Sequence, residues 1–275
     1  IGSGPSSPMK IAIDCRDENM LSKIIDCLGT LAPYDKSENP FVMQAVKKNC
    51  SEAFVQKLVA AGAIAALQSS PEEALSDALE SAIETPNNTS LQMLINQKIE
   101  WNDGMQKKIV GILIKKILFP DFPPAADEKI ASVLSLLVSG GFNMNVTDKD
   151  EYALLPVACA SKYFKTVREM ISLGADLNVL SNSQSGGKTT ALAFCAANDY
   201  EEIGKLLIDK GADVTIHGTV KDGSVFNDES ALHHAVHYEK AAMVKMLLST
   251  NKIPKEDIQR ALLTACCFND RETTD

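Results

Sequence analysis

The sequence predicts an all-α fold, built as an α-solenoid of stacked helix–turn–helix repeats with projecting loops or β-hairpins. The first observation is that apolar residues recur at three- and four-residue spacing, which is typical of amphipathic helices, while convincing strand patterns are absent. This spacing is found in segments 20–28, 54–61, 105–118, 130–138, 165–171, 201–208 and 241–248. The second observation is that most of these segments end near Gly or Asn, the residues that commonly follow a helix C-terminus.

The ends of these helices recur at a nearly regular interval. Consecutive corresponding positions lie between 33 and 43 residues apart, at Gly29, Gly62, Lys98, Gly141, Gly174, Gly211 and Asn251. Shorter apolar helices are predicted before several of the long ones, at 77–84, 154–160, 191–197 and 231–236. A period near 33 residues with insertions is typical of stacked two-helix units.

The motifs at these positions resemble the ankyrin repeat family. The stretch Thr190-Ala191-Leu192-Ala193-Phe194-Cys195-Ala196 resembles the family's first-helix motif, and Gly211-Ala212-Asp213-Val214-Thr215 resembles its closing loop. Segment 230–236 gives a second clear match and segment 153–178 a third. The resemblance is clear over about 127–253 and degenerate over 9–102.

The resemblance implies one ankyrin repeat domain over 9–275, preceded by a tag or flexible lead at 1–8. We expect this chain to be a fragment of a longer protein. The predicted units are about 9–29, 39–63, 74–102, 104–145, 149–178, 188–215 and 228–253, with a partial unit at 256–270.

Segment 182–190, NSQSGGKTT, ends like a phosphate-binding P-loop. That motif requires a glycine where Asn182 stands and a buried strand before the loop, and this sequence has neither. The resemblance instead implies a projecting β-hairpin at 179–189, with Gly186 and Gly187 forming a flexible tip. Thr190 would cap the next helix, and Lys188 would be an exposed loop charge. A nucleotide-dependent enzyme using this loop remains an alternative.

The composition restricts the classes of partner and compartment. The net charge is −9 and the pI about 5.0, so we expect no nucleic-acid partner. No apolar run is long enough to cross a membrane, so we expect no membrane insertion. The seven cysteines include no CxxC pair, which favours reduced thiols in the cytoplasm or nucleus.

Histidines and cysteines give candidate sites that we interpret as structural. His233 and His237 are four residues apart, as two metal ligands on one helix face would be, but we find no third ligand in the pattern. The resemblance places His233 where an imidazole ties neighbouring loops together. Cysteines in short first helices should be small core residues; these are Cys159, Cys195 and Cys266. We therefore expect no metal and no cofactor.

Three further segments have structural interpretations. Trp101 should pack between units, and the loop at 148–151 should be solvated. The insertion at 119–128 contains three prolines, which stop helix continuation. Its Phe119 and Phe122 are expected to cover the stack, with a docking surface as the alternative.

The resemblance implies a monomeric scaffold without enzymatic activity that binds a protein or peptide on the concave face of the stack. The alternative is a regulatory or targeting segment of a larger enzyme, channel or host-directed effector whose active domain lies beyond residue 275. Positions in the short helices and the loops before them should face the partner. These are Tyr152, Val157, Phe194, Asn198, His234, His237, Tyr238, Asp150, Lys188 and Phe226.

Overall fold

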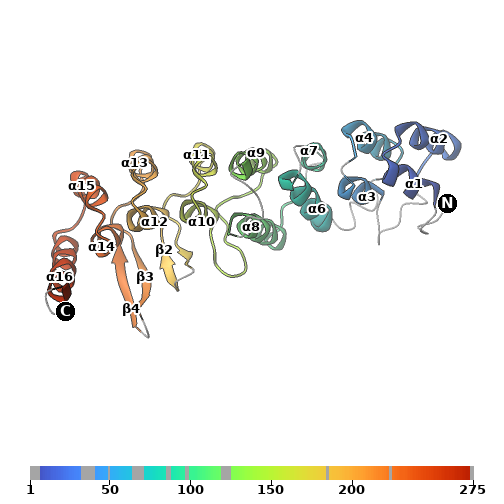
Figure 1. Ribbon diagram of the computed structural model, residues 1–275. Helices are drawn as coiled ribbons and strands as arrows, with labels where there is room; N and C mark the ends of the chain where they lie inside the picture. Colours follow the sequence, from blue (N-terminus) through green and yellow to red (C-terminus); the bar gives the residue numbers. More distant parts are fainter. Residues whose placement is uncertain are drawn as a thin grey trace. The chain divides into compact units, whose positions relative to one another are not determined.

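A computed structural model describes most of the chain as helix pairs joined by short loops (Figure 1). The described residues are 7–31, 41–48, 50–63, 71–84, 88–96, 99–118, 125–183, 186–222 and 225–272. Contacts divide the chain into two compact units, Ile1–Met105 with Ser132–Phe142 and Gln106–Ala131 with Asn143–Asp275. The boundary passes through helices α8 (Asp103–Leu118) and α9 (Ala125–Ser139).

The first unit contains three further helix pairs. They are α1 (Pro8–Cys15) with α2 (Glu18–Leu28), α3 (Phe41–Lys47) with α4 (Glu52–Ala60), and α6 (Pro71–Glu84) with α7 (Thr89–Asn96). Each pair coincides with one of the repeat units predicted from the sequence. Side chains cap the N-termini of two of these helices. The Asp17 carboxylate accepts hydrogen bonds from two backbone N–H groups of α2, and the Ser51 hydroxyl accepts one from Phe54 N.

The first helix begins earlier than predicted. The Ser7 hydroxyl accepts a hydrogen bond from Lys10 N at 3.2 Å, and Pro8 occupies the first turn, where its missing N–H costs nothing. Met9 on this helix is fully buried. Ser7 and Pro8 therefore belong to the fold rather than to the predicted lead, while residues 1–6 lie outside the described residues.

Trp101 connects the closing loop of its repeat to that of the next repeat, in agreement with the predicted packing role. Its indole Nε1 donates to the Gly140 carbonyl at 2.6 Å, and its ring lies 5.3 Å from that of Phe142. Gly140 has no room for a side chain, since an added Cβ would lie 2.5 Å from Ile95 Cγ2.

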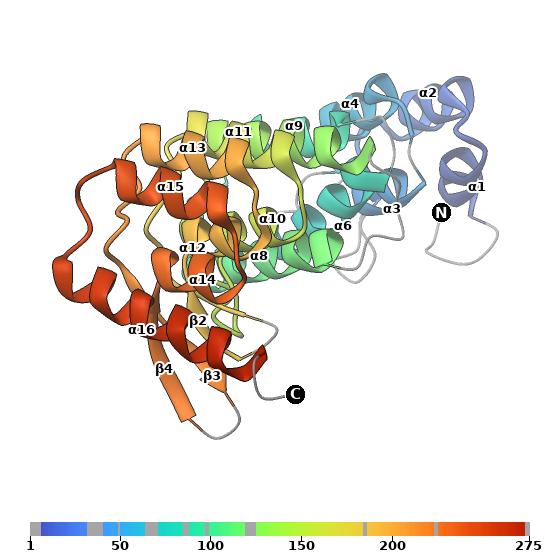
Figure 2. The same cartoon turned by 60° about the vertical axis from the view of Figure 1, so that its left-hand side comes forward.

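The second unit places its first helices side by side in one layer and its second helices in another (Figures 1 and 2). The pairs are α10 (Leu154–Ala160) with α11 (Phe164–Ser172), α12 (Ala191–Asn198) with α13 (Glu201–Asp209), and α14 (Ala231–His237) with α15 (Ala241–Ser249). Helix α16 (Lys255–Glu272) then packs on α14. Its Leu262 and Leu263 are 60% and 67% exposed.

Positive φ angles follow the second helices at the positions that defined the repeat period. Gly174 and Gly211 have φ of 85° and 96°, and Asn251 takes the same region with φ of 54°. A side chain strains this conformation, and glycine adopts it freely. The regularly spaced glycines in the sequence therefore lie at helix ends, as predicted. Lys98, the other position of this series that is not glycine, lies outside the described residues.

Hydrogen bonds between consecutive repeats tie the closing loops together. The Asn145 carboxamide oxygen accepts from Asp176 N at 2.9 Å, and that of Asn178 accepts from Asp213 N at 2.8 Å. On the second helices, one carboxylate of the preceding repeat caps α11, because Asp127 accepts from Lys165 N, Thr166 N and the Thr166 hydroxyl. Contacts of this nearest-neighbour kind are typical of solenoids.

Two β-hairpins extend from the layer of first helices. Strands β1 (Ser181–Asn182) and β2 (Gly187–Thr189) form the hairpin predicted at 179–189. Strands β3 (His217–Asp222) and β4 (Val225–Ser230) form a second, longer hairpin that the sequence analysis missed. Because β2 also pairs with β3, the four strands make one antiparallel sheet in the order β1-β2-β3-β4.

Candidate functional site

Residues of α12, α14 and the sheet, with neighbouring turns, line a groove of about 220 Å³. Figure 2 shows these helices beside β2 and β3. The sheet contributes Thr189 and Thr219, and Ser183 follows β1 directly. The helices with the turn after α14 contribute Ala193, Phe194, Ala197, Asn198, His234 and Tyr238. No charged side chain is among these lining residues.

Equivalent positions of two consecutive repeats form the walls of the groove. Phe194 and His234 each stand four residues after the residue that caps their helix, Thr190 in one repeat and Ser230 in the next. Small side chains such as Ala193 keep the groove open between them. The caps hold these helices in place, since the Thr190 hydroxyl accepts from Ala193 N at 3.2 Å.

Tyr238 forms an exposed aromatic rim. Its ring is stacked nearly parallel to that of His234, with an interplanar angle of 8° and centroids 6.3 Å apart. His237 meets the other side of this rim edge-on, at 4.7 Å from the Tyr238 ring. Tyr238 is 48% exposed, so a flat aromatic surface faces solvent beside the groove.

His234 is a buried imidazole without a hydrogen-bond partner. It is 8% exposed, and neither Nδ1 nor Nε2 has a partner among the described residues. Burial, together with the neighbouring His237 and His233, lowers the pKa of His234 to about 4. The ring is therefore neutral near pH 7, with one nitrogen able to donate and the other able to accept.

Thr189 is a second buried polar group without a partner. Its side chain is 5% exposed, and its hydroxyl Oγ1 makes no hydrogen bond to the described residues. Buried polar atoms in folded proteins are nearly always paired, so an unpaired one needs an explanation. Thr189 and His234 come from different repeats and are both among the residues that line the groove.

The sheet that closes one side of the groove depends on a glycine. Gly187 has φ of 82°, and a Cβ placed there would lie 1.9 Å from the Thr219 carbonyl oxygen. The absence of a side chain lets β2 approach β3, where Lys188 N donates to the Thr219 hydroxyl at 2.9 Å. Gly187 is thus a strand residue rather than the predicted flexible tip.

The Gly-Lys-Thr sequence is not arranged as a phosphate cradle. Its Lys188 N–H is already used by Thr219, and Lys188 Nζ forms an ion pair with Glu151 Oε2 at 3.0 Å. A P-loop instead directs several free N–H groups toward one anion.

The structure brings four of the predicted contact residues together in this groove: Phe194, Asn198, His234 and Tyr238. His237 is exposed and packs against the Tyr238 ring. Asp150, Tyr152 and Lys188 do not line the groove. The loop that contains Asp150 contacts β1, because Asn182 Nδ2 donates a hydrogen bond to the Asp150 carbonyl oxygen.

One predicted contact residue does not enter the site, and the side chain of another is not described. Val157 is 3% exposed, because this short side chain is covered where α10 packs against α12. We therefore leave it out of the contact set. Phe226 belongs to β4, but its side chain lies outside the described part of the chain.

Sequence reasoning missed the contribution of the sheet to the groove. Ser183, Thr189 and Thr219 line it, yet the prediction drew contacts mainly from the short helices. Thr189 stands directly before the cap residue Thr190, and this pair of threonines was the available signal. Thr219 belongs to the unpredicted hairpin, so no repeat motif pointed to it.

Several structural interpretations can be compared with the described residues. Cys159 and Cys195 are fully buried, as predicted, and a hydrogen bond with Cys195 and burial raise the pKa of the Cys159 thiol well above its ordinary value. Cys266 is exposed, so its assignment to the core was wrong. Phe119 and Phe122 lie outside the described residues.

Two polar residues also differ in detail from their predicted roles. Asp148 is buried rather than solvated, and its Oδ1 accepts from Asp150 N and Tyr152 N, each at 2.9 Å. His233 caps its own helix, because its Nδ1 accepts from Ser230 N at 3.2 Å. Its ring also contacts that of His217 on β3, which gives it the structural role expected.

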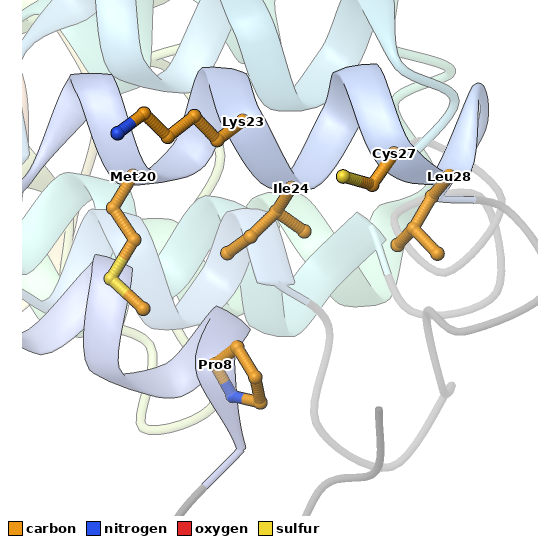
Figure 3. A pocket seen from close by; sticks show the side chains of 6 residues that line it. All are labelled: Pro8, Met20, Lys23, Ile24, Cys27 and Leu28. Atoms are coloured by element: carbon orange, nitrogen blue, oxygen red, sulfur yellow. The ribbon is translucent and has the colours of Figure 1, made fainter.

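A second depression, in the first unit, is almost entirely apolar. It has a volume of about 240 Å³ and is lined by Pro8, Met20, Lys23, Ile24, Cys27 and Leu28. Figure 3 shows Met20, Ile24 and Leu28 along α2, with Pro8 of α1 facing them. Its described lining residues include no convergent polar groups, so the groove is the better candidate for a recognition site.

No helix among the described residues is both long and apolar enough to cross a membrane.

Comparison with known proteins identifies the repeats. Residues 125–218 match the family model for ankyrin repeats (3 copies), and residues 227–258 match that for an ankyrin repeat. No curated protein matches the chain. The chain therefore contains ankyrin repeats over 125–258, and the predicted ankyrin-type helical fold is confirmed. Ankyrin repeats in general mediate protein–protein interactions, so this part of the chain is a protein-interaction module.

Proposed function

We propose that the ankyrin repeats over 125–258 form a scaffold that binds one protein partner at the groove between α12 and α14, without catalysing a reaction. The observation that supports this most strongly is the convergence of Phe194, His234 and Tyr238 from two consecutive repeats on one groove. Aromatic residues beside a polar group are favoured anchors in protein interfaces.

The size and chemistry of the groove favour a protein over a free small molecule. Its volume of about 220 Å³ is below the roughly 300–1,000 Å³ of ordinary ligand pockets. It can accept one side chain of a larger partner, while Tyr238 and Asn198 at the rim contact the adjoining surface. The acidic net charge of −9 would favour a partner with a complementary basic surface around that anchor.

The test is affinity capture from lysate with three forms of the protein, read by mass spectrometry. The forms are the parent chain, a groove variant with Phe194→Ala and Tyr238→Ala, and a control with Lys205→Ala and Leu248→Ala. Both control positions have exposed side chains on α13 and α15, away from the groove lining.

A protein captured by the parent and the control, but lost by the groove variant, would support the proposal once the purified pair binds with the same pattern. Capture of the same proteins by all three forms, or loss with the control, would refute it. Tyr238→Ala alone removes a side chain that is 48% exposed, so it tests the groove even if the double variant folds poorly.

A further inference from the structure

The hairpin of β3 and β4 contacts the last helix, α16, through a histidine. The His217 ring on β3 lies between two carboxylates that come from different elements. Its Nε2 is 2.9 Å from Asp257 Oδ2 of α16, and its Nδ1 is 3.1 Å from Asp228 Oδ2 of β4. The helix itself packs on α14 (Figure 2). His217 therefore joins the hairpin to α16 by a contact that can change its charge.

The strand register holds His217 and Asp228 on one face of the hairpin. His217 is paired with Ser230, and Thr219 with Asp228, and residues two apart in a strand share a face. The Asp228 carboxylate therefore stays near the ring whether or not α16 is docked. The Asp257 carboxylate reaches the ring only from α16, so this second contact exists only in the docked state.

Asp257 lies on the buried face of α16. It is 6% exposed, and Ala261, one turn later on the same face, is also buried. A carboxylate that is removed from water needs a partner, because burying an unpaired charge is unfavourable. Docking of α16 on α14 therefore places a negative charge beside the His217 ring.

A neutral His217 ring cannot serve both carboxylates. Neutral imidazole has one N–H group, so its other nitrogen presents a lone pair to a negatively charged oxygen. The protonated ring has two N–H groups and a positive charge, so it can attract both carboxylates. The contact at Nδ1 has the distance of an ion pair without the geometry of a hydrogen bond, so charge rather than direction decides its strength.

Two further ionisable groups surround His217 among the described residues. Arg260 of α16 donates from Nη2 to the Asp228 carbonyl oxygen at 2.8 Å, and arginine keeps its charge near neutral pH. The ring of His233 on α14 lies 5.9 Å from that of His217. Burial, and then the charge of Arg260, lower the pKa of His233, so this ring is neutral near pH 7. Histidine is the side chain whose charge ordinarily changes in the neutral range, which leaves His217 as the group that can switch this contact.

We propose that His217 is a pH-sensitive latch for α16, which holds the helix on the last repeat when the ring is protonated and releases it more readily when the ring is neutral. The docked helix brings Asp257 to the ring, so docking and protonation favour each other. Docking is therefore strongest below the neutral range and weakens as the pH rises through it. Release uncovers the side of α14 on which α16 packs. This device is independent of the partner proposed for the groove.

Hydrogen exchange of the whole chain tests the latch at the backbone amides of α16. It is measured at pH 6 and pH 8 and corrected for the intrinsic exchange rates, with the amides of α13 as a report on opening of the repeats. His217→Gln cannot gain a proton, and Asp257→Asn removes the charge that α16 brings to the ring. His237→Gln is the matched control, because this exposed histidine lies at the far end of α14 beside Tyr238.

In the parent and in His237→Gln, the protection of α16 should be about fivefold greater at pH 6 than at pH 8. This factor is the difference between a charge-assisted and a neutral hydrogen bond. His217→Gln and Asp257→Asn should show the lower protection at both pH values. The sign identifies the latch, because the lowered pKa values of His233 and His234 make the fold less stable as the pH falls.

Several results would overturn the latch. The same pH dependence in His217→Gln as in the parent would assign it to another group, and greater protection of α16 at pH 8 would reverse its sign. Equal protection of α16 and α13 at both pH values in the parent would show that α16 does not open separately. Should His217→Gln unfold the repeats, Asp257→Asn decides alone, and a fivefold change retained in that variant would refute the latch.

Discussion

Replacing His234 by leucine should stabilise the protein. His234 is buried with two unpaired nitrogens, and leaving a buried polar group unsatisfied costs about 1–3 kcal/mol. Leucine has a similar size and no polar atom, so His234→Leu should raise the free energy of unfolding at pH 7 by about that amount.

The same substitution should flatten the pH dependence of stability. The folded-state pKa of His234 is about 4, below the value of about 6.5 expected in the unfolded chain. As the pH falls, the unfolded chain therefore binds a proton at this residue before the folded protein does. The free energy of unfolding is highest above about pH 6.5 in this respect and decreases as the pH falls toward 4. Between pH 7 and pH 5 the loss amounts to about 2 kcal/mol.

Urea denaturation at pH 7 and pH 5, followed by far-UV circular dichroism, measures both effects. Burial also lowers the pKa of His233, but this group is common to parent and variant and cancels in their difference. The parent should lose about 2 kcal/mol more than His234→Leu between the two pH values. A variant less stable than the parent at pH 7, or with the same pH dependence, would refute the burial and lack of partners assigned to His234.

Two further substitutions test the frame around the groove. Asp127→Ala removes the carboxylate that caps α11 from the preceding repeat, so the free energy of unfolding should fall by about 2 kcal/mol in urea denaturation. The adjacent Glu128→Ala, which breaks only an exposed ion pair, should have no measurable effect, and equal losses would contradict this assignment. Gly187→Ala should separate β2 from β3, because its Cβ would overlap the Thr219 carbonyl oxygen; hydrogen exchange should then show loss of protection at Lys188 N–H, and unchanged protection would disprove the close approach.

The repeat frame was predictable because its determinants are local. Gly174 and Gly211 mark helix ends where φ is positive, and the Thr190 hydroxyl caps the start of the next helix. Each signal depends on residues within a few positions in the chain. The helix pairs from α10 to α15 could therefore be predicted from the sequence, whereas α1, α3 and α7 correspond to no helix predicted from the spacing of apolar residues.

The features that were missed depend on contacts between distant segments. The hairpin of β3 and β4 interrupts the repeat pattern, and β3 is held partly by its pairing with β2, 31 residues earlier at Lys188 and Thr219. Burial of Asp148 and Val157 likewise follows from how neighbouring segments pack. No local pattern reveals that Thr189 and His234 lack partners, since this depends on every group around them.

Site-specific photo-crosslinking tests the central claim most directly. A photo-crosslinking amino acid at position 198, on the exposed rim of the groove, is compared in lysate with the same residue at position 205 on α13. We expect position 198 to give a covalent adduct with one protein, lost when Phe194→Ala and Tyr238→Ala are added, while position 205 gives none. Adducts of equal yield at both positions, or an adduct at 205 alone, would contradict a partner bound in the groove between α12 and α14.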